Sequence, residues 1–173
     1  FEIFDNKQPQ PIAFFRSDVQ PISVVVTLDM SGSMVNVLEF VKQAAEAFVL
    51  RLLPADRARI GTFDDKLQIM PTFTSNRDAL IRYLHTEMDF GNGTRLWDGV
   101  DEAIAAVEQE TNRRVVLVLS DGDDTTSKLG SGEVLARAQK NDVMIYAIGL
   151  RNLYRGGPQG QMILSRPDGA LKG

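Results

Sequence analysis

The 173-residue sequence contains no cysteine and only a single histidine. Without cysteine the chain forms no disulfide and no thiolate metal site, although this absence does not fix the cellular compartment. Since these residue types are missing or nearly so, any chemistry has to come mainly from carboxylates and hydroxyls.

Long apolar runs and basic clusters are also missing. No apolar run approaches the roughly 20 residues that a helix needs to span a bilayer, and no Lys/Arg stripe marks a nucleic-acid interface. The net charge is −4, with 43% hydrophobic and 24% charged residues, an ordinary composition for a globular domain. We therefore expect a monomeric domain that neither binds nucleic acid nor inserts directly into a membrane. The chain starts at Phe1 without an initiator Met or a signal peptide, and we expect it to be part of a longer protein.

Five segments are predicted to be strands. Residues 22–28 are almost continuously apolar and β-branched, which is typical of a parallel strand buried on both faces. Two of the other strands are joined by a short turn at Asp64-Asp65, and so short a link indicates an antiparallel pair. The predicted strands are residues 22–28, 59–63, 67–73, 115–119 and 143–148.

Four segments with helical features alternate with these strands. The first has apolar residues at helical spacing and ends before Pro54, and Asn76 is the expected N-cap of the second. The predicted helices are residues 35–53, 76–88, 96–110 and 131–140. Strands that alternate with helices indicate an α/β fold with a mainly parallel sheet and right-handed crossovers.

Both ends of the chain differ from its centre. Residues 1–20 are predicted to form an N-terminal β-hairpin arm with strands at 2–4 and 12–15, restricted to an edge position by its two prolines. Residues 151–173 are rich in Gly, Pro and Arg and show little periodicity. We therefore expect a central domain over residues 21–150, followed by an irregular segment or a truncated end of that domain.

Two of the predicted buried strands end in an aspartate. Ligands of open parallel sheets bind beyond the carboxyl ends of the strands, so we expect Asp29 and Asp121 to approach each other, with Thr94 in reach. Two nearby carboxylates repel unless a cation lies between them, and carboxylate and hydroxyl oxygens suit a hard divalent ion. The predicted metal site consists of Asp29, Ser31, Ser33, Thr94 and Asp121. Neutral hydroxyl ligands would leave the ion short of negative charge, with one position open to water or to a carboxylate from outside.

The order Asp29-x-Ser31-x-Ser33, then Thr94 in Gly-Asn-Gly-Thr, then Asp121 in Ser-Asp-Gly resembles the von Willebrand factor A-type (VWA) domain. All five positions of that family's metal-ion-dependent adhesion site (MIDAS) are intact, and the resemblance covers residues 21–150. It implies a doubly wound, Rossmann-like α/β fold with a mainly parallel sheet, one antiparallel edge strand and helices on both faces. It also implies bound Mg²⁺ or Mn²⁺, with Ca²⁺ as an alternative. The flanking segments are similar to the bacterial exported subgroup.

The resemblance implies a non-catalytic, metal-dependent module for adhesion or protein interaction. Its metal would capture a Glu or Asp carboxylate of a partner protein, in an extracellular, periplasmic or cell-surface location. Two alternatives stay open at this point. One is a metal-dependent hydrolase of phosphate or ester substrates, against which no His or Lys lies near the motif in sequence. The other is a structural domain whose site is empty.

The site residues also have purely structural interpretations. Asp29 and Ser33 are candidate caps of the helix that follows them. Asp121 with Gly122 is a candidate turn, and Thr94 lies in a glycine-rich loop that could merely be flexible.

Four further residues are expected to have no role as ligands. Asp123 and Asp124 are predicted to be solvated, because their segment fails the pattern of a calcium-binding loop. His85 is predicted to be a structural residue at or near the surface, and Trp97 to pack in the core or to line the rim of the site.

Overall fold

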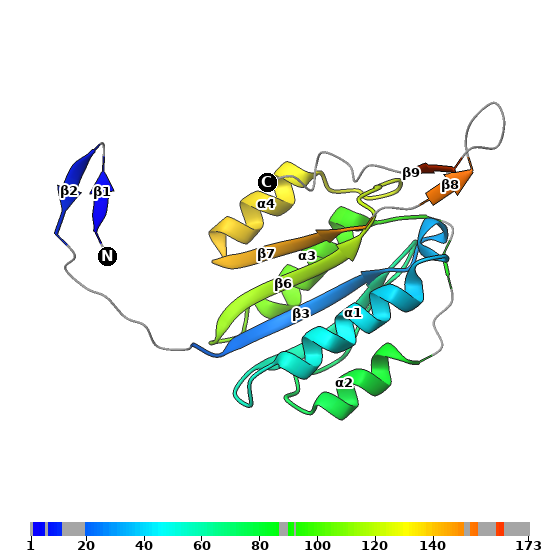
Figure 1. Cartoon of the computed structure of the whole chain (residues 1–173), viewed down its shortest axis with the longest axis horizontal. Helices are drawn as coiled ribbons and strands as arrows, with labels where there is room; N and C mark the ends of the chain where they lie inside the picture. Colours follow the sequence, from blue (N-terminus) through cyan, green and yellow to red (C-terminus); the bar gives the residue numbers. More distant parts are fainter. Residues whose placement is uncertain are drawn as a thin grey trace.

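A five-stranded sheet with the order β5-β4-β3-β6-β7 forms the centre of the computed structural model (Figure 1). The structure describes residues 2–5, 7–11, 20–86, 90–91, 93–150, 153–155 and 162–164. Four strands are mutually parallel, and β5 runs antiparallel to β4 at one edge. The strands are β3 (Ile22–Asp29), β4 (Arg57–Phe63), β5 (Leu67–Ile69), β6 (Arg113–Ser120) and β7 (Val143–Gly149). This confirms the predicted doubly wound, mainly parallel sheet with one antiparallel edge strand.

Helices cover both faces of this sheet, with α1 and α2 on the near side in Figure 1 and α3 and α4 on the far side. Their apolar residues join two separate clusters, one on each face of the sheet. A short 3₁₀ turn, η1 (Gly32–Met34), precedes the helices α1 (Leu38–Arg51), α2 (Arg77–Leu84), α3 (Leu96–Val107) and α4 (Ser131–Lys140).

The central strand β3 is buried on both faces. Val24 and Val26 pack in the cluster under α1 and α2, whereas Val25 packs in the cluster under α3 and α4. All three side chains are fully buried. Such burial explains the nearly continuous apolar run of this strand, and it fixes the strand's carboxyl end in position at the centre of the sheet.

Some element boundaries differ from those predicted. The first helix begins at Leu38 instead of residue 35, because η1 and the residues after it form the turn that leaves β3. β5 ends at Ile69 instead of residue 73, since Pro71 has no N–H for the ladder. The second helix ends at Leu84 and the third at Val107, each before the residue predicted. The predicted N-cap is confirmed, because the side chain of Asn76 accepts a hydrogen bond from the N–H of Ala79.

The N-terminal arm contains a hairpin of β1 (Ile3–Asp5) and β2 (Gln8–Gln10). Its second strand was predicted at 12–15, a segment outside the described residues, and the observed partner of β1 is β2. In the C-terminal segment, β8 (Leu153–Arg155) and β9 (Met162–Leu164) form an antiparallel pair. The other residues predicted to be irregular lie outside the residues that the structure describes. The division at residues 20 and 150 stays a prediction. Within the described ranges, no helix has the length and apolar character for a bilayer span.

Candidate metal centre

The candidate site lies where β3 and β6 end side by side. These strands pair in parallel up to Leu28 and Leu119, so the next residues, Asp29 and Ser120, end their strands at the same edge. The hydroxyl of Ser120 donates a 2.6 Å hydrogen bond to Oδ2 of Asp29. A direct contact therefore links the two strand ends that the sequence predicts to converge.

The carboxylate of Asp29 is fully buried and held on both oxygens. Besides the bond from Ser120, Oδ1 accepts the backbone N–H of Ser31 at 2.9 Å. Burial raises the pKa of Asp29, and the charge of Asp121 raises it further, although the hydrogen bonds from Ser120 and Ser31 oppose this. Among the described residues, the ionised Asp29 carboxylate therefore lacks a compensating positive charge, which a bound cation would supply.

The two serines of the motif lie next to each other. Their hydroxyl oxygens are 3.0 Å apart, with Ser31 buried and Ser33 exposed. Neither helix cap predicted as an alternative is observed: no side chain caps η1, and α1 has Val37 at its N-cap without a side-chain hydrogen bond. Asp29 instead bonds the backbone two residues further on, which shapes the turn.

Asp121 follows β6 directly and is 6% exposed. The turn interpretation holds in part, because Gly122 has a φ of 93°, a conformation that glycine adopts without a steric cost. The N–H of Asp123 donates a long 3.4 Å hydrogen bond back to Oδ1 of Asp121. The carboxylate of Asp121 is close enough to Asp29 to raise the pKa of Asp29.

Thr94 is buried and precedes α3. Its N–H donates to Oγ1 of Thr125 at 2.9 Å, and its carbonyl accepts the N–H groups of Thr125 and Thr126 at 3.0 and 3.1 Å. The glycine-rich loop that ends at Thr94 is thus fixed to the β6–α4 loop at this point, and the loop leads back to Asp121. The structure thus links Thr94 to the loop after Asp121 through the N–H and carbonyl groups of Thr94.

A second close approach holds this loop against the aspartate motif. Gly91 forms a parallel bridge with Ser31, and its N–H donates to the carbonyl of Met30 at 3.3 Å. A Cβ atom at Gly91 would lie 2.5 Å from the Cβ of Asp64, so a larger residue does not fit. The neighbouring Asp64 has a raised pKa, mainly through burial and also through its partner Asp65, so its ionised form is disfavoured at this rim of the site.

The donor set fits a hard divalent cation. Two carboxylates and three hydroxyl groups come from the end of β3 and the turn after it, from the residue after β6, and from Thr94, two residues before α3. Among the residues that the structure describes, no three His, Cys, Asp or Glu residues gather in a way that would hold an ion. A cation at this site would therefore depend on hydroxyl ligands, which suits Mg²⁺ or Mn²⁺ better than Zn²⁺. Binding of the metal by the five residues stays a prediction.

Sequence reasoning missed two contributors to the site. Ser120 is part of the quoted Ser-Asp-Gly pattern, but its bond to Asp29 depends on strand pairing across 91 positions. Asp124 is exposed, as predicted, but its capping role was not predicted: its carboxylate accepts the N–H of Leu96 at 3.0 Å. An acidic residue shortly after a strand, such as Asp124, is a candidate helix cap. The residue that Asp124 caps, Leu96, lies 28 positions earlier in the sequence, so local spacing does not indicate the pair.

Two other predictions concern residues outside the ligand set. His85 is half exposed and its Nε2 lies 2.9 Å from the carboxylate of Glu46, which confirms a structural residue at the surface. Trp97 is partly buried and packs against the cluster under α3 and α4.

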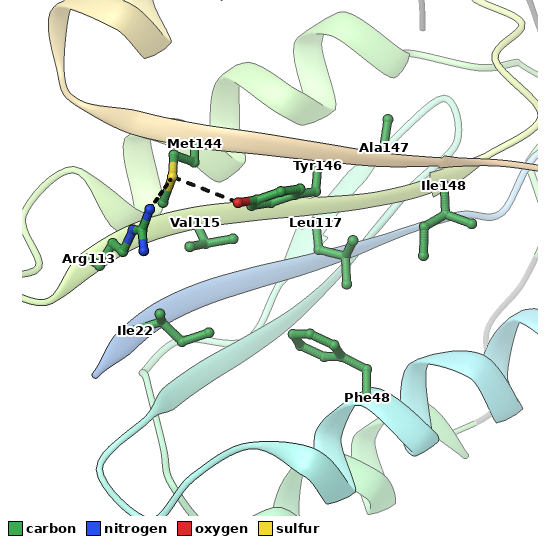
Figure 2. Close-up of a pocket in the computed structure, with 9 residues that line it drawn as sticks. All are labelled: Ile22, Phe48, Arg113, Val115, Leu117, Met144, Tyr146, Ala147 and Ile148. Carbon is green, nitrogen blue, oxygen red and sulfur yellow. Dashed lines mark hydrogen bonds between the residues drawn. The ribbon is translucent and has the colours of Figure 1, made fainter. Parts of the chain in front are cut away.

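A separate apolar groove of about 470 Å³ lies between α1 and the β6–β7 side of the sheet (Figure 2). Tyr146 and Arg113 both contact the sulfur of Met144 there, at 3.9 and 3.3 Å. The lining contains none of the predicted metal ligands and no carboxylate. It consists of Ile22, Phe48, Arg113, Val115, Leu117, Met144, Tyr146, Ala147 and Ile148.

Comparison with known proteins agrees with this architecture. Residues 24–123 match the family model of the von Willebrand factor type A domain. An uncharacterized protein of Borreliella burgdorferi is 29% identical over 137 residues, covering 73% of this chain and 40% of that protein. The chain thus spans less than half the length of this relative.

Two solved structures show the same fold. An aerotolerance-related membrane protein from Bacteroides fragilis superposes with a TM-score of 0.71 at 18% identity, covering 87% of this chain and 84% of that one. The pilus adhesin SpaC from Lactobacillus rhamnosus GG gives a TM-score of 0.62 at 16% identity, covering 80% of this chain and 25% of that one.

The family model covers more than half of the chain, including both aspartates of the candidate site. The protein therefore belongs to the von Willebrand factor type A domain family, whose members are generally interaction or adhesion modules.

Proposed function

We propose that this domain is a divalent-metal-dependent protein-binding module that captures a Glu or Asp carboxylate of a partner protein. The observation that supports this most is the Asp29 carboxylate, whose ionised form is disfavoured mainly by burial and also by the charge of Asp121, and which accepts a hydrogen bond from the hydroxyl of Ser120. Carboxylates that repel each other at the end of a sheet are stabilised by a cation between them. When bound, Mg²⁺ or Mn²⁺ would supply a positive, coordinatively open centre to which an outside carboxylate binds.

The chain's own residues prepare this site. Ser120 and the Ser31 N–H orient the Asp29 carboxylate from two sides, so that it does not need to reorganise when the ion arrives. Ser33 is exposed next to the buried Ser31, which brings a hydroxyl ligand to the surface that a partner can reach. The carboxyl groups of Asp64 and Asp65 lie beside Gly91 at the rim and would favour a partner whose carboxylate is flanked by basic residues.

We propose a non-catalytic role in preference to hydrolysis. A metal-dependent hydrolase needs a group that accepts or delivers protons near the ion. The single histidine, His85, lies on the far end of α2 as its C-cap and contacts Glu46 of α1, not a residue of the site. An extracellular, periplasmic or cell-surface location is supported by the fold shared with a membrane protein and with a pilus adhesin.

Calorimetric titration with Mg²⁺ tests the site, together with thermal unfolding in Mg²⁺ and in chelator. The native chain should bind one ion and melt at a higher temperature with metal than without. Asp121→Asn should lose both effects, because it removes one of the two charges. Asp142→Asn is the matched control: it deletes the same charge at an exposed position with a φ of 55°, which Asn tolerates, and should bind Mg²⁺ like the native chain. A native chain without a metal response would favour the empty structural domain, and turnover of phosphate or ester substrates lost in Asp121→Asn would favour the hydrolase.

A further inference from the structure

The first turn of α3 is capped by side chains from the β6–α4 loop, residues 122–130. Arg95 occupies the N-cap position but makes no side-chain capping bond. Instead, Asp124 accepts the N–H of Leu96 at 3.0 Å. Ser127 accepts the N–H groups of Trp97 and Asp98 at 3.0 and 3.2 Å, and donates its own hydroxyl to Asp124 at 2.6 Å. The first N–H groups of a helix have no partner within the helix, so this loop satisfies them from outside.

The bonding is reciprocal, because the loop's own backbone is satisfied by the start of α3. Thr94 accepts the N–H groups of Thr125 and Thr126 through its carbonyl. The carboxylate of Asp98 accepts the N–H groups of Lys128 and Leu129 at 3.1 to 3.2 Å. Donors and acceptors thus alternate between the two segments, so each segment supports the geometry of the other.

This exchange connects two predicted ligands that are far apart in sequence. Asp124 lies three residues after Asp121, and its bond partner Leu96 lies two residues after Thr94. A closed ring of covalent and hydrogen bonds therefore passes through Thr94, Leu96 and Asp124, because the N–H of Thr125 also donates to the carbonyl of Thr94. Asp121 joins this ring through the short covalent link of residues 122–123. Asp29 and Ser31 belong to a different segment, which is held by Ser120 and Gly91.

We propose that Asp124 is a positioning residue of the metal centre, which holds Thr94 in place relative to Asp121 before the ion binds. The inference rests on the proposed metal-binding function and names a residue that sets the affinity without touching the ion. Loss of a group that orients a metal ligand typically weakens metal binding by about 10- to 100-fold. Asp124→Ala should weaken Mg²⁺ binding by about tenfold at a temperature where the variant is fully folded.

A double-mutant cycle separates positioning from general stability. In a Thr94→Ala background, Asp124→Ala should add less than about a twofold loss of Mg²⁺ affinity, because the ligand that it positions is already gone. Glu133→Ala is the control at the other end of the same loop: Glu133 accepts the Gly130 N–H at 3.0 Å and so supports the start of α4 without a bond to residues 94–96 in the described structure. It should lower the melting temperature and leave the Mg²⁺ affinity unchanged.

The Asp124→Asn variant separates the hydrogen bond from the charge. Asparagine keeps an oxygen that accepts the Leu96 N–H, so near-native Mg²⁺ affinity is expected, whereas weakening equal to that of Asp124→Ala would mean that the negative charge alone attracts the ion and would overturn positioning. Amide hydrogen exchange of Leu96 in metal-free protein gives a second readout: Asp124→Ala should accelerate it and Glu133→Ala should not.

The outcomes distinguish this inference from the function on which it rests. A native chain that binds Mg²⁺ together with an Asp124→Ala variant that binds it equally well would overturn the positioning role and leave the metal site intact. A native chain that binds no Mg²⁺ would overturn the proposed function, and the positioning role with it.

Discussion

Ser120 and Asp29 end the two central parallel strands and are joined by a 2.6 Å hydrogen bond from hydroxyl to carboxylate. Both residues are completely buried. The bond lies between the two strands whose ends form the candidate site, and it fixes the direction of the Asp29 carboxylate. A buried acceptor that loses its donor costs more than an ordinary surface contact, because water does not replace the lost bond.

Ser120→Ala should therefore lower the free energy of unfolding by about 1 to 3 kcal/mol and should also weaken Mg²⁺ binding. Urea unfolding in chelator measures the first effect and calorimetry the second. Ser23→Ala is the matched control, since Ser23 is equally buried at the opposite end of β3 and donates to Glu110 at 2.8 Å. It should cost similar stability without changing the metal affinity. Equal metal affinity in both variants would mean that Ser120 has only a structural role.

Gly122 follows Asp121 with a φ of 93°, a value that disfavours any residue with a Cβ atom. Gly122→Ala should destabilise the fold by about 1 to 2 kcal/mol, and the shift of the turn should move Asp121. Thermal unfolding with and without Mg²⁺ tests this: the gain in melting temperature with metal should be smaller in the variant than in the native chain. Gly132→Ala provides the comparison, because an added Cβ atom there meets nothing within 4 Å and lies in a helix. Its response to metal should equal the native one.

The contacts of the Asp98 carboxylate predict a specific loss of stability in acid. Burial opposes its ionisation, but hydrogen bonds from Arg95 and from the N–H groups of Leu129 and Lys128 outweigh burial and lower the pKa of Asp98 below its ordinary value. A carboxyl group with a lowered folded-state pKa stabilises the fold above its unfolded pKa, and this contribution is lost as the pH falls through the folded value. The free energy of unfolding should therefore decrease below about pH 4. Asp98→Asn should be less stable at neutral pH and show a flatter decrease in acid, as measured by urea unfolding in chelator. Parallel pH profiles of the two proteins would contradict this role.

Patterns within single elements predicted the fold well. The continuous apolar run of β3 indicates burial on both faces, the short link at Asp64-Asp65 indicates an antiparallel pair, and Asn76 caps α2 as expected. Boundaries were predicted less well: the turn after β3 delays α1 until Leu38, and Pro71, which the sequence itself shows, shortens β5.

The supporting residues of the site were harder to predict than the candidate ligands. Asp124 caps a helix that begins 28 positions earlier in sequence, and Ser120 contacts a residue 91 positions away. No local spacing rule connects such pairs, since their distances are set by the order of strands in the sheet. The candidate ligands were found because they follow predicted strands and match the motif of a family.

The most direct test of the central claim is water-proton relaxation with Mn²⁺ bound to the protein. An ion that keeps an open position holds exchangeable water, so the native chain should enhance the relaxation rate, and added acetate, as a probe for a partner's carboxylate, should reduce that enhancement. Asp29→Ala should abolish the enhancement by preventing binding. A native chain without enhancement, or with an enhancement that acetate leaves unchanged, would contradict capture of an acidic residue at an open metal site.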